Sequence, residues 1–230
     1  MAISHPQATD LVDRAMLWSL AAKLFAYPDE REPDPATRLA LAPINPHAAW
    51  PTELAEAMGA LERGAEALPR GTFLESSDLA AEHTYLFARQ TLAPPRETSY
   101  AEGPATAHGA AMADLAAFYK AFGFQASDGL PSDHASVEFA FMAALLAKEA
   151  IALEHDWTEK ARLTRAARHK FVADHLGRWL PTFIERLETH ARIAFYPLVG
   201  QLALALARAE SGVPTAAVAV TDRPARSALG

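Results

Sequence analysis

Residues Gly129–His155 read GLPSDHASVEFAFMAALLAKEAIALEH, and this stretch decides the fold. Gly129 and Pro131 end whatever structure precedes them, and apolar side chains then recur at helical spacing at positions 137, 141, 144 and 145. Nothing in the sequence breaks this pattern before His155. It predicts a helix of about six turns, roughly 33 Å long, which would cross a small domain. We expect this helix to lie at the centre of a helical bundle.

Asp133 and His134 stand at the start of this helix, where we expect them to be exposed. Asp133 is predicted to cap the helix, because its carboxylate can accept the free backbone N–H of Ala135 or Ser136. One interpretation is that Asp133 is only a cap and His134 an ordinary first-turn residue. The other is that the pair lines a ligand site. A catalytic dyad is the least favoured use, because no serine or cysteine nucleophile stands out nearby.

The composition favours helices. Half of the 230 residues are hydrophobic, with many Ala and Leu, which are good helix formers. Alternating Val, Ile and Thr runs of strand length are missing except for a short one near the end. The sequence predicts an all-α fold, with a single-domain helical bundle over residues 1–210 and a disordered tail over residues 211–230.

Charge and cysteine content restrict the class of protein. There is no cysteine, which fits a reducing compartment and provides neither a thiolate metal site nor a thiol nucleophile. Charged residues interrupt the apolar ones near the amino terminus, so we expect no signal peptide, and no apolar run is long enough to span a membrane. The net charge of −7 disfavours nucleic acid as a partner. We expect a cytoplasmic protein.

Proline positions and apolar spacing predict the remaining helices. Pro28 ends a first helix, and the proline-rich stretch 27–51 predicts loops and short turns. Pro181 is expected to interrupt a helix that starts near Thr158, and the last helix is kinked or begins near Pro197. The predicted helices cover residues 10–25, 52–68, from 76 or 77 past 87, 107–122, 133–155, 158–180 and the region from 195 to 206.

Residues 91–104, TLAPPRETSYAEGP, are the least regular part of the domain. Irregular loops of this length are uncommon in compact domains and are often functional. The two prolines stiffen the chain, while Arg96, Glu97 and Tyr100 supply charge and an aromatic ring. A surface connector and a binding wall both remain open as interpretations.

Motifs for common chemistries are missing from the sequence. There is no HExxH, no repeated Glu-x-x-His pair, no phosphate-binding glycine loop and no GxSxG. His169 and His175 are six residues apart and are therefore predicted on different faces of one helix. We expect no catalytic residue, no metal site and no cofactor.

Five segments together resemble the TorD/DmsD/NarJ family of molybdoenzyme-specific chaperones, most closely the branch that serves type II enzymes of the dimethyl sulfoxide reductase family. Their order and spacing agree over roughly residues 10–210. The segments are EHTYLF (82–87), APPRETSY (93–100), MADLAAFYKAFGF (112–124), LPSDHASVEFAFM (130–142) and FVADHLGRWLPTF (171–183).

This resemblance implies an all-helical chaperone without catalytic activity. Its partner would be the immature catalytic subunit of a molybdopterin enzyme, held by its N-terminal, often twin-arginine, leader until the cofactor is inserted and export can proceed. The protein would be a monomer or a domain-swapped dimer. The implied peptide-binding residues are Leu86, Phe87, Pro95, Arg96, Tyr100, Asp133 and His134. The implied structural residues are Glu138, Phe141 and Met142.

Two other hypotheses stay open at this point. The first is a small helical enzyme that uses Asp133 and His134 on a metal or a small substrate, or in hydrolysis. The second is a plain interaction module that binds through another surface. The chaperone hypothesis requires an apolar cleft edged by Asp133 and His134. It would fail if these two residues lay far from the 94–100 segment with no hollow between them.

Overall fold

The computed structural model describes residues 6–28, 50–67, 76–89, 91–101, 105–126 and 129–211. Within these ranges the chain forms no β-strand, only an isolated bridge between Arg96 and His134, so the all-α prediction is confirmed. The α-helices are α1 (Pro6–Phe25), α3 (Thr52–Ala67), α4 (Ser76–His83), α5 (Ala105–Ala121), α6 (Ala135–Glu154), α7 (Thr158–Phe171), α8 (Gly177–His190) and α9 (Phe195–Glu210).

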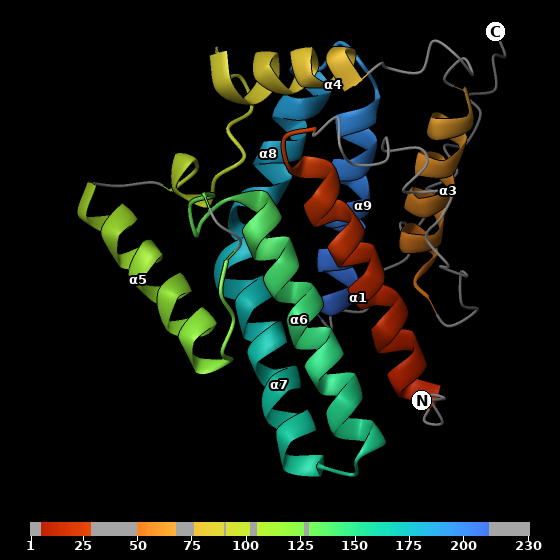
Figure 1. The fold of residues 1–230 in the computed structure, drawn as a ribbon, viewed down its shortest axis with the longest axis vertical. Helices are drawn as coiled ribbons and strands as arrows, with labels where there is room; N and C mark the ends of the chain where they lie inside the picture. The colour runs from red at the N-terminus through yellow and green to blue at the C-terminus, as the bar shows by residue number, and fades with distance from the viewer. Residues whose placement is uncertain are drawn as a thin grey trace, which may run out of the picture.

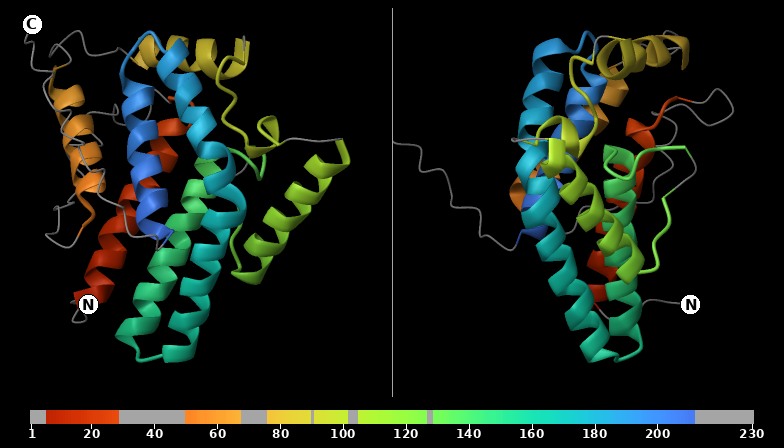
Figure 2. Two further views of the ribbon diagram at one scale, coloured as in Figure 1. Left: turned by 180° about the vertical axis from the view of Figure 1, so that it is seen from behind. Right: turned by 90° about the vertical axis from the view of Figure 1, so that its left-hand side faces the viewer.

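Helices α1, α6, α7, α8 and α9 form the long bundle (Figure 1). Helix α1 lies against α6 and runs antiparallel to it, and both α3 and α8 lie against α9. Helix α4 crosses one end of the bundle, and α5 lies outside it (Figures 1 and 2). The predicted central helix is therefore α6, which turns at residues 155–157 into α7.

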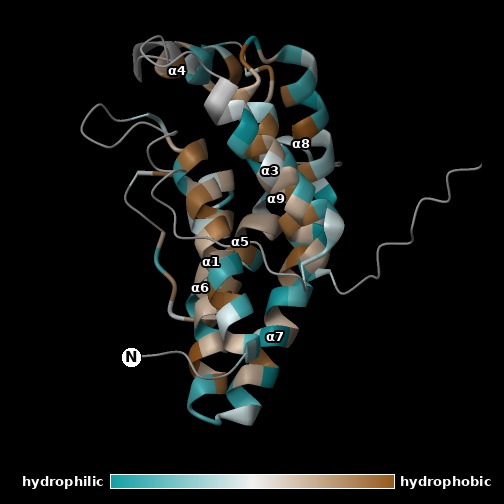
Figure 3. Cartoon of the chain, turned by 90° about the vertical axis from the view of Figure 1, so that its right-hand side faces the viewer, coloured by the Kyte–Doolittle hydropathy of each residue, from teal (hydrophilic) through white to brown (hydrophobic). Residues whose placement is uncertain are grey.

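Aromatic side chains join α1 and α6 in the core. The ring of Phe139 lies 5.2 Å from that of Trp18 and 5.8 Å from that of Phe25, and all three residues are fully buried. Burying a side chain of this size contributes about 1.5–3 kcal/mol. Figure 3 shows hydrophobic residues along α1 and α6 and hydrophilic ones over much of α7. The tight contact between α1 and α6 follows from these apolar surfaces.

A charged network lies inside the bundle and connects four helices. Arg168 of α7 pairs with Glu149 of α6 at 3.0 Å and also with Glu210 of α9, and all three side chains are buried. Arg14 of α1 reaches Glu210 at 2.6 Å, and Arg165 reaches Glu149 at 2.7 Å. Buried charges are tolerated only when they are paired, so this network dictates how the four helices meet.

The prediction that Pro181 interrupts a helix is wrong, because α8 runs through it. The irregular part lies earlier, where residues Val172–Leu176 form a π-helical turn and the N–H of Gly177 donates to the carbonyl of Val172. A Cβ on Gly177 would lie only 2.8 Å from that carbonyl oxygen. The turn therefore depends on this glycine. Pro181 is tolerated because it stands near the start of α8, where it removes a single hydrogen bond.

Helix α9 begins at Phe195 and contains Pro197 in its first turn, as predicted. Most of the proline-rich stretch 27–51 and of the tail 211–230 lies outside the described residues. No described helix combines the length and the apolar character that crossing a membrane requires.

Candidate functional site

The loop that follows α4 leads down the side of the bundle toward α5 (Figure 2). It is preceded by a π-helical segment, Thr84–Arg89, and contains a short 3₁₀ turn, Glu97–Ser99. Thr91 has a φ of 51°, which is uncommon for a β-branched residue and strains the backbone. The backbone N–H of Ala93 donates to the carbonyl of Leu86 at 3.1 Å, so the start of the loop is held against the π-helical segment.

The residues at the start of α6 are buried, which corrects the prediction that they are exposed. Asp133 has no solvent-exposed surface and His134 is almost as buried, because the 91–101 loop covers them. The predicted cap is also wrong. His134 is the N-cap residue of α6, and its Nδ1 accepts the backbone N–H of Ser136 at 3.1 Å. The Asp133 carboxylate is thereby left free to bind the loop.

Asp133 binds two side chains of the loop. The Arg96 guanidinium donates from Nε at 3.1 Å and from its terminal nitrogen at 3.0 Å to Asp133 Oδ1. The Thr98 hydroxyl donates to Asp133 Oδ2 at 2.5 Å, and the Thr98 N–H lies 3.4 Å from the same oxygen. Charge-assisted hydrogen bonds of this kind are about twice as strong as neutral ones. Asp133 is therefore the anchor of the loop.

Backbone hydrogen bonds hold the same two segments together independently of these side chains. The N–H of Glu97 donates to the Asp133 carbonyl at 3.0 Å, and the N–H of Ala135 donates to the Pro95 carbonyl at 2.9 Å. The Tyr119 hydroxyl of α5 donates to the Ser132 carbonyl at 2.7 Å. We name the contact of residues 95–98 with residues 132–135 the loop junction. It brings together Pro95, Arg96, Asp133 and His134 of the predicted site.

His134 is neutral near pH 7. Burial, with a smaller contribution from the nearby His83, lowers the pKa of His134 from 6.5 to about 4, although Asp133 opposes the shift. A ring with so low a pKa, and with Nδ1 already used as a helix cap, is a poor general base at pH 7.

Replacing His134 with asparagine will reduce the loss of stability that the protein shows as the pH falls below about 6.5. Asparagine keeps an acceptor for the helix cap but cannot titrate. In the wild type, the His134 ring takes up a proton near pH 6.5 in the unfolded chain but only near pH 4 in the folded state. The free energy of unfolding therefore falls as the pH drops between these values, by about 2–3 kcal/mol from this residue. Urea unfolding between pH 4.5 and 7.5 measures the difference.

The wild type and the His134→Asn variant should have nearly equal stability at pH 7.5. His83, whose pKa is also lowered to about 4 by burial, is present in both proteins and cancels in the comparison. Parallel profiles for the two proteins would contradict the assignment of the acid sensitivity to His134.

A second buried contact joins the loop to the end of α7. Glu97 is buried, and its two carboxylate oxygens lie 3.1 and 3.0 Å from Nδ1 of His175. The other ring nitrogen of His175 lies 3.3 Å from the carboxylate of Asp114 on α5. His175 belongs to the π-helical turn Val172–Leu176, so that turn directs its ring toward the loop.

Glu138 adds a third carboxylate beneath the loop junction. It is fully buried, and the indole N–H of Trp179 donates to one of its oxygens at 3.2 Å. Its other oxygen, Oε1, has no hydrogen-bond partner among the described residues. Burial and the charge of Glu97 raise the pKa of Glu138 well above its usual value, and Asp133 adds to this. Three acidic groups therefore lie close enough to influence one another.

Tyr100 closes the outer end of the loop. Its ring stacks on that of Trp179, with the centroids 5.8 Å apart, and the Arg186 guanidinium lies 5.1 Å from the Tyr100 ring. The Tyr100 side chain is only partly buried. Of the predicted site residues, Tyr100 and Arg96 are thus the two that reach the surface.

Leu86 and Phe87 lie in the core beneath the site. Leu86 is fully buried, and the Phe87 ring packs against His83 at 4.7 Å and against Tyr196 at 5.1 Å. In this conformation these two residues form no part of the surface. Glu138, Phe141 and Met142, which were expected to be structural, are all fully buried.

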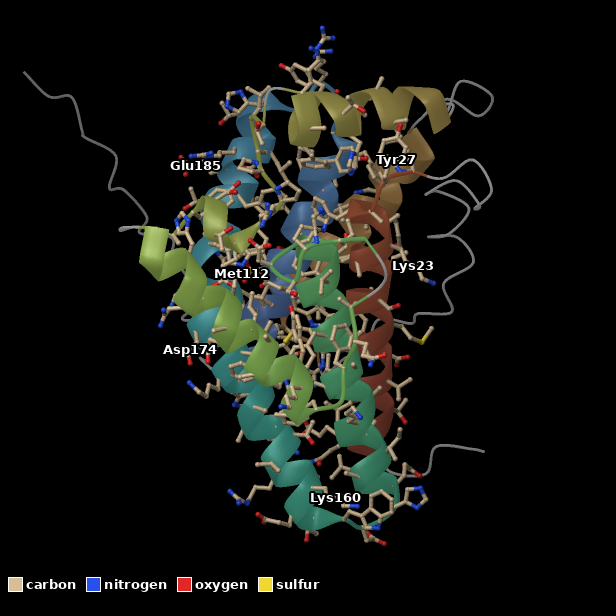
Figure 4. All side chains as sticks on the ribbon, turned by 60° about the vertical axis from the view of Figure 1, so that its left-hand side comes forward. Lys23, Tyr27, Met112, Lys160, Asp174 and Glu185 are labelled. Atoms are coloured by element: carbon tan, nitrogen blue, oxygen red, sulfur yellow. The ribbon has the colours of Figure 1, made fainter. Side chains whose placement is uncertain are left out.

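Sequence reasoning missed the polar partners of the loop. Nothing in the residue spacing indicated that Glu97 and His175, which are 78 positions apart, would meet. His169 is exposed and His175 buried, in agreement with their predicted positions on different faces. The described residues contain no group of three or more His, Asp or Glu side chains that could hold a metal ion. Among the side chains labelled in Figure 4, Lys160 lies at the lower end of the bundle and Tyr27 near its upper end.

Comparison with known proteins identifies the family. No solved structure matches the chain significantly. The family model described as nitrate reductase delta subunit matches residues 47–185, which is more than half of the chain. The matched range contains the whole loop junction as well as Glu138, His175 and Trp179. Members of this family are known as chaperones of molybdenum enzymes. The chain therefore belongs to the nitrate reductase delta subunit family of NarJ/TorD-like chaperones.

Proposed function

We propose that this protein binds the immature catalytic subunit of a molybdopterin enzyme of the dimethyl sulfoxide reductase family in the cytoplasm, through the N-terminal leader of that subunit. Binding keeps the subunit competent for insertion of the molybdenum cofactor before export. The observation that carries the proposal is the ion pair between Arg96 and Asp133, which unites the two segments implied as the binding site.

The chemistry of a twin-arginine leader suits this part of the surface. Such a leader has a basic end followed by an apolar stretch. Asp133 and Glu97 provide an acidic centre that favours a guanidinium group, with the carboxyl group of Glu138 beside them. Tyr100 supplies aromatic surface beside it, and burial of apolar area would contribute about 25 cal/mol per Å² before ordering costs. Leu86 and Phe87 support this surface from beneath.

Calorimetry with a synthetic leader peptide tests the proposal. The peptide is the twin-arginine leader of a molybdopterin oxidoreductase subunit, and a second version carries lysine in place of both arginines. We expect the arginine peptide to bind, and Asp133→Asn to weaken binding about tenfold or more, because a charge-assisted hydrogen bond contributes about 1.5–3 kcal/mol.

Asp156→Asn is the matched control variant. Asp156 is an exposed acid at the opposite end of α6, and its φ of 57° suits asparagine, so the substitution removes the same charge without straining the backbone. Its binding should equal that of the wild type. The proposal is wrong when neither the leader nor the cofactor-free subunit binds. Binding of a subunit that lacks its leader would instead indicate a different recognition element.

A further inference from the structure

We propose that Asp133 is a guanidinium-binding site that the chain's own Arg96 occupies in the free protein, and that an arginine of the client must displace Arg96 in order to bind. The inference rests on the proposed function for the identity of the client. It also reassigns Arg96 from a peptide contact to an internal competitor of the peptide.

The Arg96 and Asp133 side chains differ in their exposure to solvent. The Asp133 side chain is completely buried, whereas the Arg96 side chain that covers it is 44% exposed. The guanidinium therefore covers the Asp133 carboxylate, while part of the Arg96 side chain is already exposed to solvent. When the Arg96 side chain swings outward, it uncovers a carboxylate that no solvent reaches at present.

The attachment of the loop to the start of α6 does not depend on the Arg96 side chain. Its backbone stays attached through the hydrogen bonds from Glu97 N–H to the Asp133 carbonyl and from Ala135 N–H to the Pro95 carbonyl. The contact between Glu97 and His175 holds the next residue of the loop. Arg96 can leave Asp133 while the loop junction remains intact, so the exchange of one guanidinium for another needs no change of fold.

Two further carboxyl groups lie close to Asp133. The charges of Glu97 and Asp133 both raise the pKa of the neighbouring Glu138, after the larger effect of burial. Glu138 Oε1 is fully buried and has no hydrogen-bond partner among the described residues. A site with unused acceptor capacity and one partly exposed cation can take a guanidinium from outside.

Removing the competitor tests the inference. With the same leader peptide, Arg96→Ala should bind about tenfold tighter or more than the wild type, because the binding-competent fraction of the protein is no longer reduced by the internal ion pair. Arg162→Ala is the control for net charge, since Arg162 is exposed and pairs only locally with Glu159 among the described residues. Its affinity for the peptide should equal that of the wild type.

A small probe tests the site without any client. N-ethylguanidinium at millimolar concentration should raise the melting temperature of Arg96→Ala but not that of the wild type, and ethylammonium should do so less because it cannot form two parallel hydrogen bonds. Adding Asp133→Asn to Arg96→Ala should abolish the effect. When the wild type binds the leader, equal or weaker peptide binding by Arg96→Ala would overturn the inference. Equal responses to the two probes would overturn it in every case.

One outcome separates this inference from the proposed function. Rescue by N-ethylguanidinium without any binding of the leader supports the guanidinium site and contradicts the leader as its partner. Should Arg96→Ala fail to fold, the nuclear magnetic resonance signal of the Arg96 Nε–H in the wild type serves instead. On saturation with leader it should move to the position of a solvent-exposed arginine, and an unchanged signal in the complex would overturn the inference.

Discussion

Replacing Arg168 with methionine will lower the free energy of unfolding by about 3–5 kcal/mol. Arg168 lies between the carboxylates of Glu149 and Glu210, and both carboxylates are fully buried. Methionine fills much of the same space, so the loss comes mainly from the charges that remain without their shared partner. Urea unfolding at pH 7, followed by circular dichroism, measures the change.

The control for this substitution lies on the same helix. Arg162 of α7 pairs with Glu159, and their side chains are 70% and 75% exposed, so Arg162→Met should change the stability by no more than about 0.5 kcal/mol. Adding Glu149→Gln to Arg168→Met should restore part of the loss, because a carboxylate that has lost its buried partner is then replaced by a neutral group. Equal effects of the two arginine substitutions would show that the buried charged network stabilises the fold no more than an exposed ion pair does.

Replacing Phe141 with alanine will cost about 3–5 kcal/mol and will loosen α5 before the rest of the bundle. The Phe141 ring lies 4.8 Å from that of Tyr119, 5.3 Å from that of Phe124 and 4.9 Å from that of Phe171. Tyr119 and Phe124 belong to α5 and the turn after it, so Phe141 is the main aromatic residue against which α5 packs. Urea unfolding gives the global loss, and hydrogen exchange locates it.

Ile151→Ala is the matched control on α6. Ile151 is 53% exposed, so its truncation should change the stability by about 0.5 kcal/mol or less. The amides of α5 should exchange faster in Phe141→Ala and remain unchanged in Ile151→Ala. A uniform increase of exchange over the whole bundle would contradict a specific role of Phe141 in holding α5.

The helices of the bundle could be predicted because each is encoded locally. Apolar spacing from Val137 to Leu145 and the breaks at Pro28 and Gly129 are properties of neighbouring residues, and the structure contains helices where they indicate them. The errors arose where a distant contact outweighs the local preference. Asp133 is a good cap by type, yet it binds Arg96, and the cap is formed by His134 instead.

The candidate site could be predicted only in part. Asp133, His134, Pro95 and Arg96 meet at the loop junction, as the chaperone hypothesis required. Leu86 and Phe87 lie beneath it in the core, because the π-helical segment turns them inward. A regular helical repeat predicts which residues share a face of the helix. A π-helical turn shifts that register, and the sequence carries no reliable signal for such a turn.

The sequence by itself determined that this protein is a helical bundle of the nitrate reductase delta subunit family, and which residues lead into its central helix. Only the tertiary structure decided which charges meet, such as Arg96 with Asp133, Glu97 with His175 and Arg168 with Glu149. The physical reason is that helix formation depends on residues within a few positions of one another. A buried charge, in contrast, is stable only beside a partner that packing brings from a distant part of the chain.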